Sequence, residues 1–201
     1  MSSDDDYRPI KFIDRLEGNN HIVLLYDNER YADKIIARYF LNGLEKGESC
    51  IFFTPEDPES IEKRLAAQGI DVDLYKKKNS LRIFNIERSD ENKRDMLGTL
   101  KHIRAEAVKG MKPPYRFAGR TIIDTATIEG MKLGMDLEKT GHERFSEFDN
   151  SQLCFYDISE IEPSMRDKWI SQLMKNHHHV VYASNPERAV GFETDLLVEE
   201  E

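Results

Sequence analysis

Hydroxyl and carboxylate side chains gather where short apolar runs of this sequence end. Continuous apolar runs are typical of strands buried in a parallel sheet, and ligands of such sheets bind outside the carboxyl ends of the strands. We therefore expect this edge to form one shared cleft, acidic and suited to a cation, an amine or a neutral polar ligand. Taken singly, each of these side chains also suits a helix cap or a turn. The predicted ligand-binding residues are Tyr26, Asp27, Thr54, Glu56, Asp124, Tyr156 and Asp157.

The first junction between a strand and a helix, HIVLLYDNERYADKII at residues 21–36, lacks a phosphate-binding loop. In such a loop, glycines let successive backbone N–H groups point at the phosphates, and a lysine neutralises their charge. Here no glycine occurs between Tyr26 and Ile35, and Asp27 and Glu29 place carboxylates where phosphate oxygens would lie. The sequence therefore predicts that the protein does not bind or hydrolyse ATP with useful affinity.

One alternative keeps a catalytic role. The segment TIIDTAT at residues 121–127 has the shape of a Walker B strand, whose terminal carboxylate holds magnesium in P-loop enzymes. A divergent ATPase would use Glu56 and Asp124 around that ion. A serine hydrolase of the Gly-x-Ser-x-Gly type is excluded, because that motif does not occur in the sequence.

The histidine and cysteine patterns do not predict a metal site, and no cofactor is expected. Three adjacent histidines stand at residues 177–179, and residues entering a strand point to alternate faces, so at most two of them share a side. His21 stands at the amino end of its strand, where we expect it to form structural hydrogen bonds. Cys50 and Cys154 lie inside apolar runs, which predicts buried thiols outside any disulfide.

Length and charge exclude several classes of partner. A chain of 201 residues is long enough for one domain with a substantial core. Its 29 basic and 38 acidic residues give a net charge of −9, which argues against direct binding to nucleic acid. No apolar stretch approaches the roughly 20 residues of a membrane-spanning helix. We expect a soluble, cytoplasmic protein that contacts no membrane.

Alternation of strands and helices predicts the fold class, an α/β three-layer sandwich with a mainly parallel sheet. Helical patterns cover residues 32–44, 57–69, 96–107 and 163–174, whereas residues 128–150, with three glycines among mixed charges, are expected to form a loop and a broken helix. The expected organisation is a mobile lead with a short helical piece at 1–17, one domain at 18–190 and an acidic tail at 191–201. The predicted strands are residues 21–26, 49–54, 81–86, 120–124, 152–158 and 179–184.

Several motifs carry a resemblance to a known family. The segment FFTPEDPESIEKRLAAQGID at residues 52–71 resembles the second strand and helix of RecA-like ATPases of the KaiC group, with Glu56 and Asp57 as the acidic pair. Together with HIVLLY, LCFYDIS at 153–159 and NHHHVVYASNP at 176–186, it makes the chain similar to the MEDS family. This family is the methanogen/methylotroph sensory domain first recognised in the regulator DcmR. The resemblance runs from about residue 18 to residue 188.

The resemblance implies a RecA/KaiC-like core without its phosphate loop, in a family proposed to sense small hydrocarbon derivatives. The function expected from it is a non-catalytic sensory or regulatory domain that binds a small-molecule ligand. Such a domain would signal through a protein partner, a kinase or a transcription regulator. The divergent ATPase is one alternative, and an oligomeric scaffold is another, since RecA-like domains often form homo-oligomeric rings.

Overall fold

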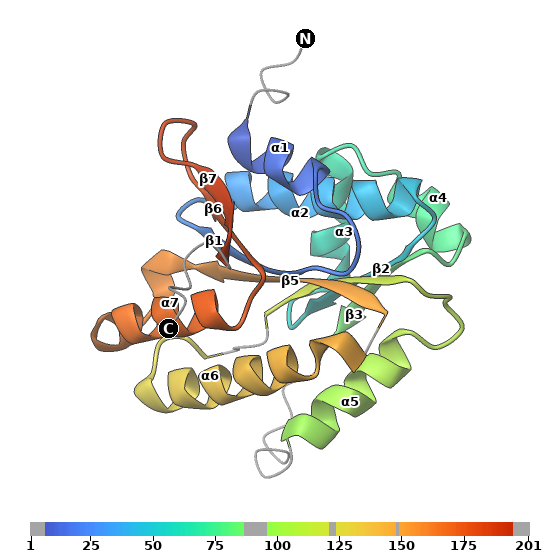
Figure 1. Cartoon of the computed structure of the whole chain (residues 1–201). Coiled ribbons are helices and arrows are strands. Elements are labelled where there is room, and N and C mark those ends of the chain that lie inside the picture. The colour runs from blue at the N-terminus through green and yellow to red at the C-terminus, as the bar shows by residue number, and fades with distance from the viewer. Residues whose placement is uncertain (1–6, 87–95, 121–123, 148, 195–201) are drawn as a thin grey trace.

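A mostly parallel β-sheet runs through the middle of the molecule (Figure 1). The computed structural model describes residues 7–86, 96–120, 124–147 and 149–194, and within them the sheet has seven strands. Their order is β3-β2-β4-β5-β1-β6-β7, with β7 alone antiparallel to its neighbour. The strands are β1 His21–Tyr26, β2 Ser49–Thr54, β3 Leu81–Asn85, β4 Tyr115–Gly119, β5 Asn150–Asp157, β6 His179–Ala183 and β7 Val190–Glu193.

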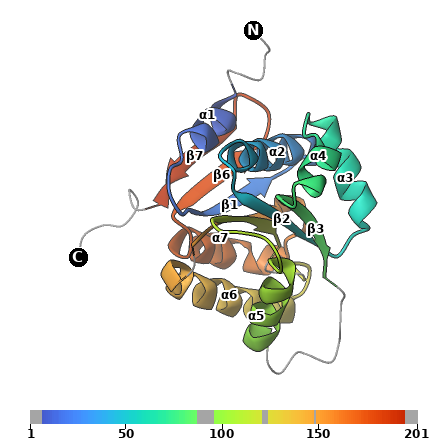
Figure 2. The ribbon, with the colours of Figure 1, turned by 90° about the vertical axis from the view of Figure 1, so that its right-hand side faces the viewer.

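Helices cover both faces of the sheet, so the predicted three-layer α/β sandwich is confirmed (Figures 1 and 2). On one side lie α1 Arg8–Asp14, α2 Glu29–Glu45, α3 Pro58–Ala67 and α4 Val72–Lys77. On the other side lie α5 Met96–Ala107, α6 Ile128–Glu143 and α7 Arg166–Lys175. Short 3₁₀ turns occur at Phe145–Glu147, Ile158–Glu160 and Pro163–Met165. None of the described helices is long and apolar enough to span a membrane.

Strand β1 lies between β5 and β6, and all six of its residues are buried. Its side chains alternate between two cores, as the pleat requires. Leu24 faces the core shared with α2, whereas Val23 faces the core shared with α6 and α7. Cys50 and Cys154 are buried in the same sheet, and neither forms a disulfide, which confirms that prediction.

The fourth predicted strand, at residues 120–124, falls mostly outside the described residues. Among the described residues, the strand between β2 and β5 is β4, Tyr115–Gly119, which was not predicted. Its sequence, YRFAG, is interrupted by Arg116, which hid it from a search for apolar runs. The arginine can be buried there because its guanidinium is paired with Glu48.

The expected loop and broken helix at 128–150 are wrong for residues 128–143. Residues 128–143 form the continuous helix α6, capped by the Thr127 hydroxyl, which accepts a hydrogen bond from the Gly130 amide. Glycine inside a helix costs about 1 kcal/mol. At Gly130 a reason is visible: a Cβ would lie 2.4 Å from the carbonyl oxygen of Asp124. Burial of Met131 and Met135 against the sheet offsets the cost.

Both ends of the described chain are part of the packed structure. Helix α1 contacts α2 and β7, and the hydroxyl of the preceding Tyr7 donates to the Ser184 carbonyl and accepts from the Ser184 amide. Strand β7 extends the sheet beyond β6. The packed unit therefore reaches beyond both limits of the domain expected at 18–190.

Candidate functional site

The carboxyl ends of the strands carry most of the predicted ligand-binding residues, but these residues serve local turns and strand links. Asp27 accepts hydrogen bonds from Tyr182 and Ser184, which ties the end of β1 to that of β6. Asp124 accepts from the Ala126 amide and the Thr127 hydroxyl and so forms the turn before α6.

The other edge residues behave in the same way. Thr54 accepts from the Glu56 amide, and Asp157 accepts from the amide and hydroxyl of Ser159. Tyr26, whose hydroxyl accepts from Arg120, lies in register with Asp157. Two strands separate β1 from β2, so the ends of these strands are about 14 Å apart. Tyr26 and Thr54 therefore do not line one narrow cleft.

Tyr156 faces the opposite side of the sheet from Tyr26. Tyr26 belongs to the core beside α2, whereas Tyr156 belongs to the core beside α6 and α7. The Tyr156 hydroxyl donates to the Glu138 carboxylate on α6, and both residues are buried. The structure thus separates Tyr156 from the strand-edge residues and joins it to a different set of polar side chains.

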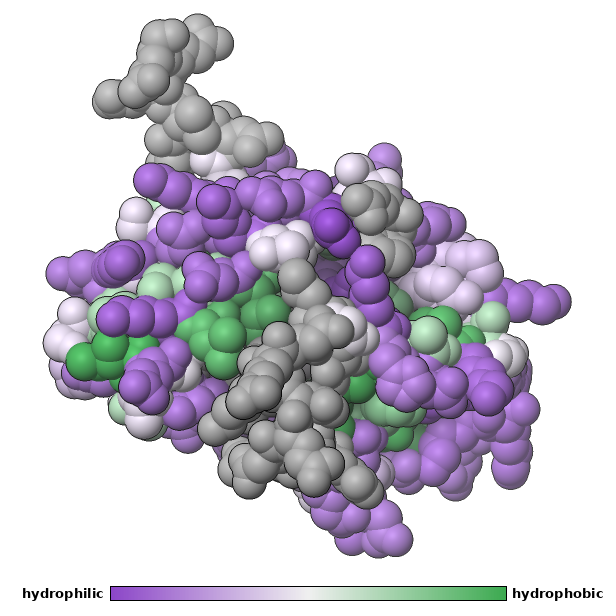
Figure 3. All heavy atoms as spheres, turned by 90° about the horizontal axis from the view of Figure 1, so that it is seen from below, coloured by the Kyte–Doolittle hydropathy of each residue, from purple (hydrophilic) through white to green (hydrophobic). Residues whose placement is uncertain are grey.

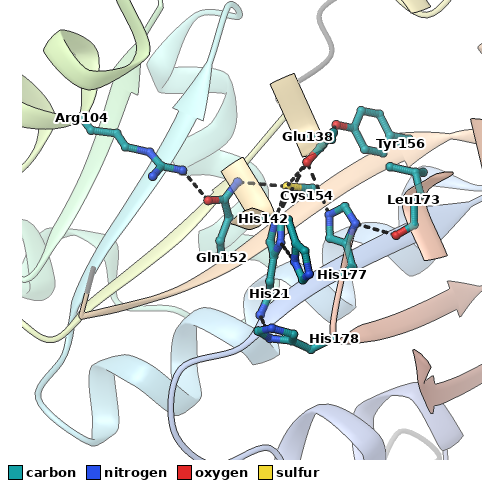
Figure 4. A network of polar contacts seen from close by, with 10 residues as sticks. All are labelled: His21, Arg104, Glu138, His142, Gln152, Cys154, Tyr156, Leu173, His177 and His178. Atoms are coloured by element: carbon teal, nitrogen blue, oxygen red, sulfur yellow. Dashed lines mark hydrogen bonds and ion pairs between the residues drawn. The ribbon is translucent and has the colours of Figure 1, made fainter. Parts of the chain in front are cut away.

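That set is a group of ionisable residues inside the molecule, here named the buried cluster: His21, Glu138, Cys154 and His177 (Figure 4). His21 begins β1, Cys154 lies in β5 and His177 lies just before β6, and these three strands are neighbours in the sheet. Helix α6 supplies the carboxylate. The Glu138 carboxylate lies 3.6 Å from His177 Nε2 and 3.9 Å from His21 Nε2. Cys154 Sγ lies 3.7 Å from His21 Nε2.

Burial fixes the charge of the two imidazoles in the buried cluster. It lowers the pKa of His21 well below its usual range, an effect that the neighbouring His177 and His142 strengthen. It lowers the pKa of His177 to about 3, although the hydrogen bond from its Nδ1 to the Leu173 carbonyl acts in the opposite direction. Both rings are therefore neutral at pH 7, and each presents a nitrogen lone pair. Two imidazoles, a thiol and a carboxylate form a donor set that can hold a metal ion.

A chain of hydrogen bonds leads from the buried cluster to a cavity (Figure 4). The Gln152 amide donates to Cys154 Sγ at 3.1 Å, and Arg104 donates to the Gln152 carbonyl oxygen at 2.5 Å. Arg104 and Gln152 line a cavity of about 50 Å³ between α5 and the sheet, here named the α5 cavity. Its walls are Phe53, Ile86, Ile103, Arg104, Phe117, Gly119, Arg120 and Gln152.

Sequence reasoning missed the buried cluster because its members are far apart in the chain. His21 was expected only to form structural hydrogen bonds. In the structure its ring centroid lies 4.0 Å from that of His177, a contact that the sequence did not indicate. One signal was present in α6, where Glu138 follows Met131 and Met135 at helical spacing on the buried side. A carboxylate inside an apolar stripe indicates a polar partner.

Comparisons with known proteins agree with this architecture. The family model described as "MEDS: MEthanogen/methylotroph, DcmR Sensory domain" matches residues 20–178. A KaiC-like protein from Pyrococcus horikoshii OT3 has a similar structure, with a TM-score of 0.60, 15% identity and coverage of 83% of this chain and 72% of that one. A second protein from this archaeon gives a TM-score of 0.56 at 10% identity, with 89% and 88% coverage. No curated protein matches the sequence. The predicted RecA/KaiC-like core is confirmed.

Proposed function

Since this chain belongs to the MEDS family of sensory domains, we propose that it is a non-catalytic sensor that binds a small organic ligand in the α5 cavity. The observation that carries the proposal is the position of Gln152. This side chain lines the α5 cavity and also donates to Cys154 in the buried cluster. A ligand in the cavity would therefore act on a hydrogen bond inside the core.

The walls of the α5 cavity suggest the chemistry of the ligand. The aromatic rings of Phe53 and Phe117 offer apolar surface, while Arg104, Arg120 and Gln152 offer N–H donors. Burial lowers the pKa of Arg104 from its usual range, although its guanidinium remains a cation at pH 7. We infer a ligand with a short hydrocarbon part and an acceptor oxygen, which is a simple hydrocarbon derivative.

The size of the cavity limits both the ligand and its affinity. A volume of about 50 Å³ has room for roughly 3–5 non-hydrogen atoms. At no more than about 1.5 kcal/mol per atom, four atoms supply at most about 6 kcal/mol, a dissociation constant in the tens of micromolar. Binding should therefore be sought at millimolar ligand concentrations.

The expected result is selective stabilisation by short oxygen-bearing compounds. We expect acetate, acetaldehyde or ethanol to raise the free energy of unfolding, by about 2.7 kcal/mol at a hundred times the dissociation constant. Ethane-saturated buffer should have a smaller effect, because ethane cannot accept a hydrogen bond from the cavity donors. Urea titration followed by circular dichroism measures the change.

The variant Ile103→Phe tests the place of binding, since it fills the α5 cavity. Its matched control is Leu133→Phe, the same increase in size at an exposed position of α6. The control should respond to ligand like the unmodified protein, and Ile103→Phe should not. Equal responses of both variants would place binding elsewhere, and no response to any compound would reject the proposed ligand class.

We also predict that ATP with magnesium does not bind measurably. Helix α2 begins directly after β1, and the Asn28 side chain already accepts the Arg30 amide at its first turn. Asp27 and Glu29 add negative charge at the same junction. Isothermal calorimetry at millimolar ATP should show no saturable heat.

A micromolar dissociation constant for ATP would instead support the divergent ATPase. In that case Asp124→Ala should abolish binding, because Asp124 is the carboxylate that would hold magnesium. The exposed Asp149→Ala is the matched control, since it removes one carboxylate away from that junction. Loss of binding in both variants would indicate a general effect of charge.

The proposed partner is a signalling protein, and α6 is the element best placed to contact it. Ile128 and Leu133 on α6 are exposed to 46% and 39%. Figure 3 shows apolar patches among hydrophilic atoms on the face seen from below, the side on which α5 and α6 lie. The same helix supplies Glu138 to the buried cluster, so a change inside would reach the surface through one rigid element.

A further inference from the structure

We propose that the buried cluster binds one divalent transition-metal ion of the zinc type. Each of its residues offers one ligand atom, and the four atoms lie within 4.8 Å of one another. In a tetrahedral zinc site, bonds of about 2.0–2.3 Å place the ligand atoms roughly 3.3–3.8 Å apart. The distances of 3.6 Å from His177 Nε2 to Glu138 and 3.7 Å from Cys154 Sγ to His21 Nε2 agree with that geometry.

The orientation of His177 points to a ligand. Its Nδ1 donates to the Leu173 carbonyl at 2.9 Å, which leaves the lone pair on Nε2. That nitrogen is buried and has no hydrogen-bond partner among the described residues, although it faces the Glu138 carboxylate. A buried polar atom in this state is unfavourable unless something else binds it. A metal ion beside Nε2 would accept the lone pair.

The donor set selects the class of ion. Two imidazole nitrogens, a cysteine sulfur and one carboxylate suit zinc and its neighbours, whereas magnesium and calcium prefer oxygen ligands throughout. The side chains of His21 and Glu138 are 1% exposed, and Cys154 and His177 are equally buried. Four protein ligands without solvent contact are typical of a structural zinc site, not of a catalytic one with an open position.

The surroundings of the buried cluster resemble the outer shell of a metal site. Tyr156 donates to the Glu138 carboxylate, Gln152 donates to Cys154 Sγ, and the Leu173 carbonyl orients His177 (Figure 4). Such partners fix the ligands and adjust their basicity. The ring of His142 stacks on that of His21. His142 is half-buried, so it lies between the buried cluster and the solvent.

The test uses the full chain, stripped of metal by a chelator and then titrated with Co²⁺ or Zn²⁺ alone. We expect one equivalent of Co²⁺ to bind, with the visible absorption of tetrahedral cobalt and a thiolate-to-cobalt charge-transfer band. Zn²⁺ should displace it in the same ratio. This readout needs no organic ligand, so the metal site and the ligand proposed for the α5 cavity succeed or fail separately.

Variants locate the ion. Cys154→Ala should remove the charge-transfer band, and Tyr156→Phe should weaken binding about 10- to 100-fold through the outer shell. Cys50→Ala is the matched control: Cys50 is equally buried but belongs to the core beside α2, so the band should persist. Circular dichroism of each variant reports whether it has folded.

Three results would overturn the proposal. The first is the absence of stoichiometric uptake by the folded, unmodified protein. The second is a charge-transfer band that persists in folded Cys154→Ala, and the third is an affinity unchanged in folded Tyr156→Phe. If Cys154→Ala fails to fold, the band of the unmodified protein and the Tyr156→Phe affinity still decide the question.

Discussion

Replacing Trp169 by alanine should lower the free energy of unfolding by about 3–5 kcal/mol. The side chain is fully buried on α7, and its ring meets that of Tyr156 edge to face at a centroid distance of 5.0 Å. Its removal would leave a cavity beneath Tyr156, which holds Glu138 in place. Because Trp169 is the one tryptophan of the sequence, urea unfolding should be followed by circular dichroism instead of fluorescence.

Two further substitutions make this prediction specific. Trp169→Phe should cost less than Trp169→Ala, since it keeps one ring and removes an indole N–H that is buried without a hydrogen-bond partner in the part of the chain that the structure describes. Leu133→Ala, at an exposed position, should change stability by no more than about 0.5 kcal/mol. A loss below 1 kcal/mol for Trp169→Ala would mean that this core is not close-packed.

The second large effect is expected from Arg116→Met, which should lower the free energy of unfolding by about 3–5 kcal/mol. The Arg116 guanidinium donates to both oxygens of Glu48, at 2.6 and 3.1 Å, and to the Tyr39 carbonyl at 2.8 Å. Its side chain is 8% exposed and that of Glu48 is 15% exposed. The substitution therefore leaves a largely buried carboxylate without its cation.

The chain contains a control for this ion pair. Arg38 donates to both oxygens of Asp14, at 2.6 and 2.7 Å, but these side chains are 40% and 31% exposed. Arg38→Met should therefore cost about 1 kcal/mol or less. The double variant Arg116→Met with Glu48→Met should recover part of the loss, since it leaves no buried charge. If Arg116→Met and Arg38→Met lowered the free energy of unfolding by the same amount, burial would not explain the strength of the Arg116–Glu48 pair.

The sequence predicts the layers of this fold better than its details. Five apolar runs are strands, because continuous apolar residues need cover on both faces of a parallel sheet. This criterion missed strand β4 because Arg116, its second residue, interrupts the apolar run. Arg116 can be buried because it pairs with Glu48, 68 positions earlier in the chain. Helix α6 was not predicted because glycines inside a helix lower its stability. Here that loss is offset by tertiary contacts, which the sequence does not show.

The candidate site was harder to predict for a geometric reason. Alternation along β5 places Cys154 and Tyr156 on the same face, which the sequence alone indicates. The sequence does not indicate which helix covers that face, because this depends on tertiary packing. The contact between Cys154 and Glu138 on α6 could therefore not be predicted. The strand-edge residues were found from strand ends alone, and that criterion does not distinguish turn formers such as Asp124 from ligand-binding residues.

The last strand of the sheet bears on local unfolding. Thr194, which follows β7, donates through its amide to the His178 carbonyl at 2.9 Å and through its hydroxyl to the His177 carbonyl. Edge elements open more readily than central ones, so β7, at one edge of the sheet, should open before the central strands β1 and β5. Such an opening would release the backbone that presents the His177 ring. Local unfolding of β7 would therefore also loosen one residue of the buried cluster. The position of the His177 ring thus depends on hydrogen bonds at the edge of the sheet.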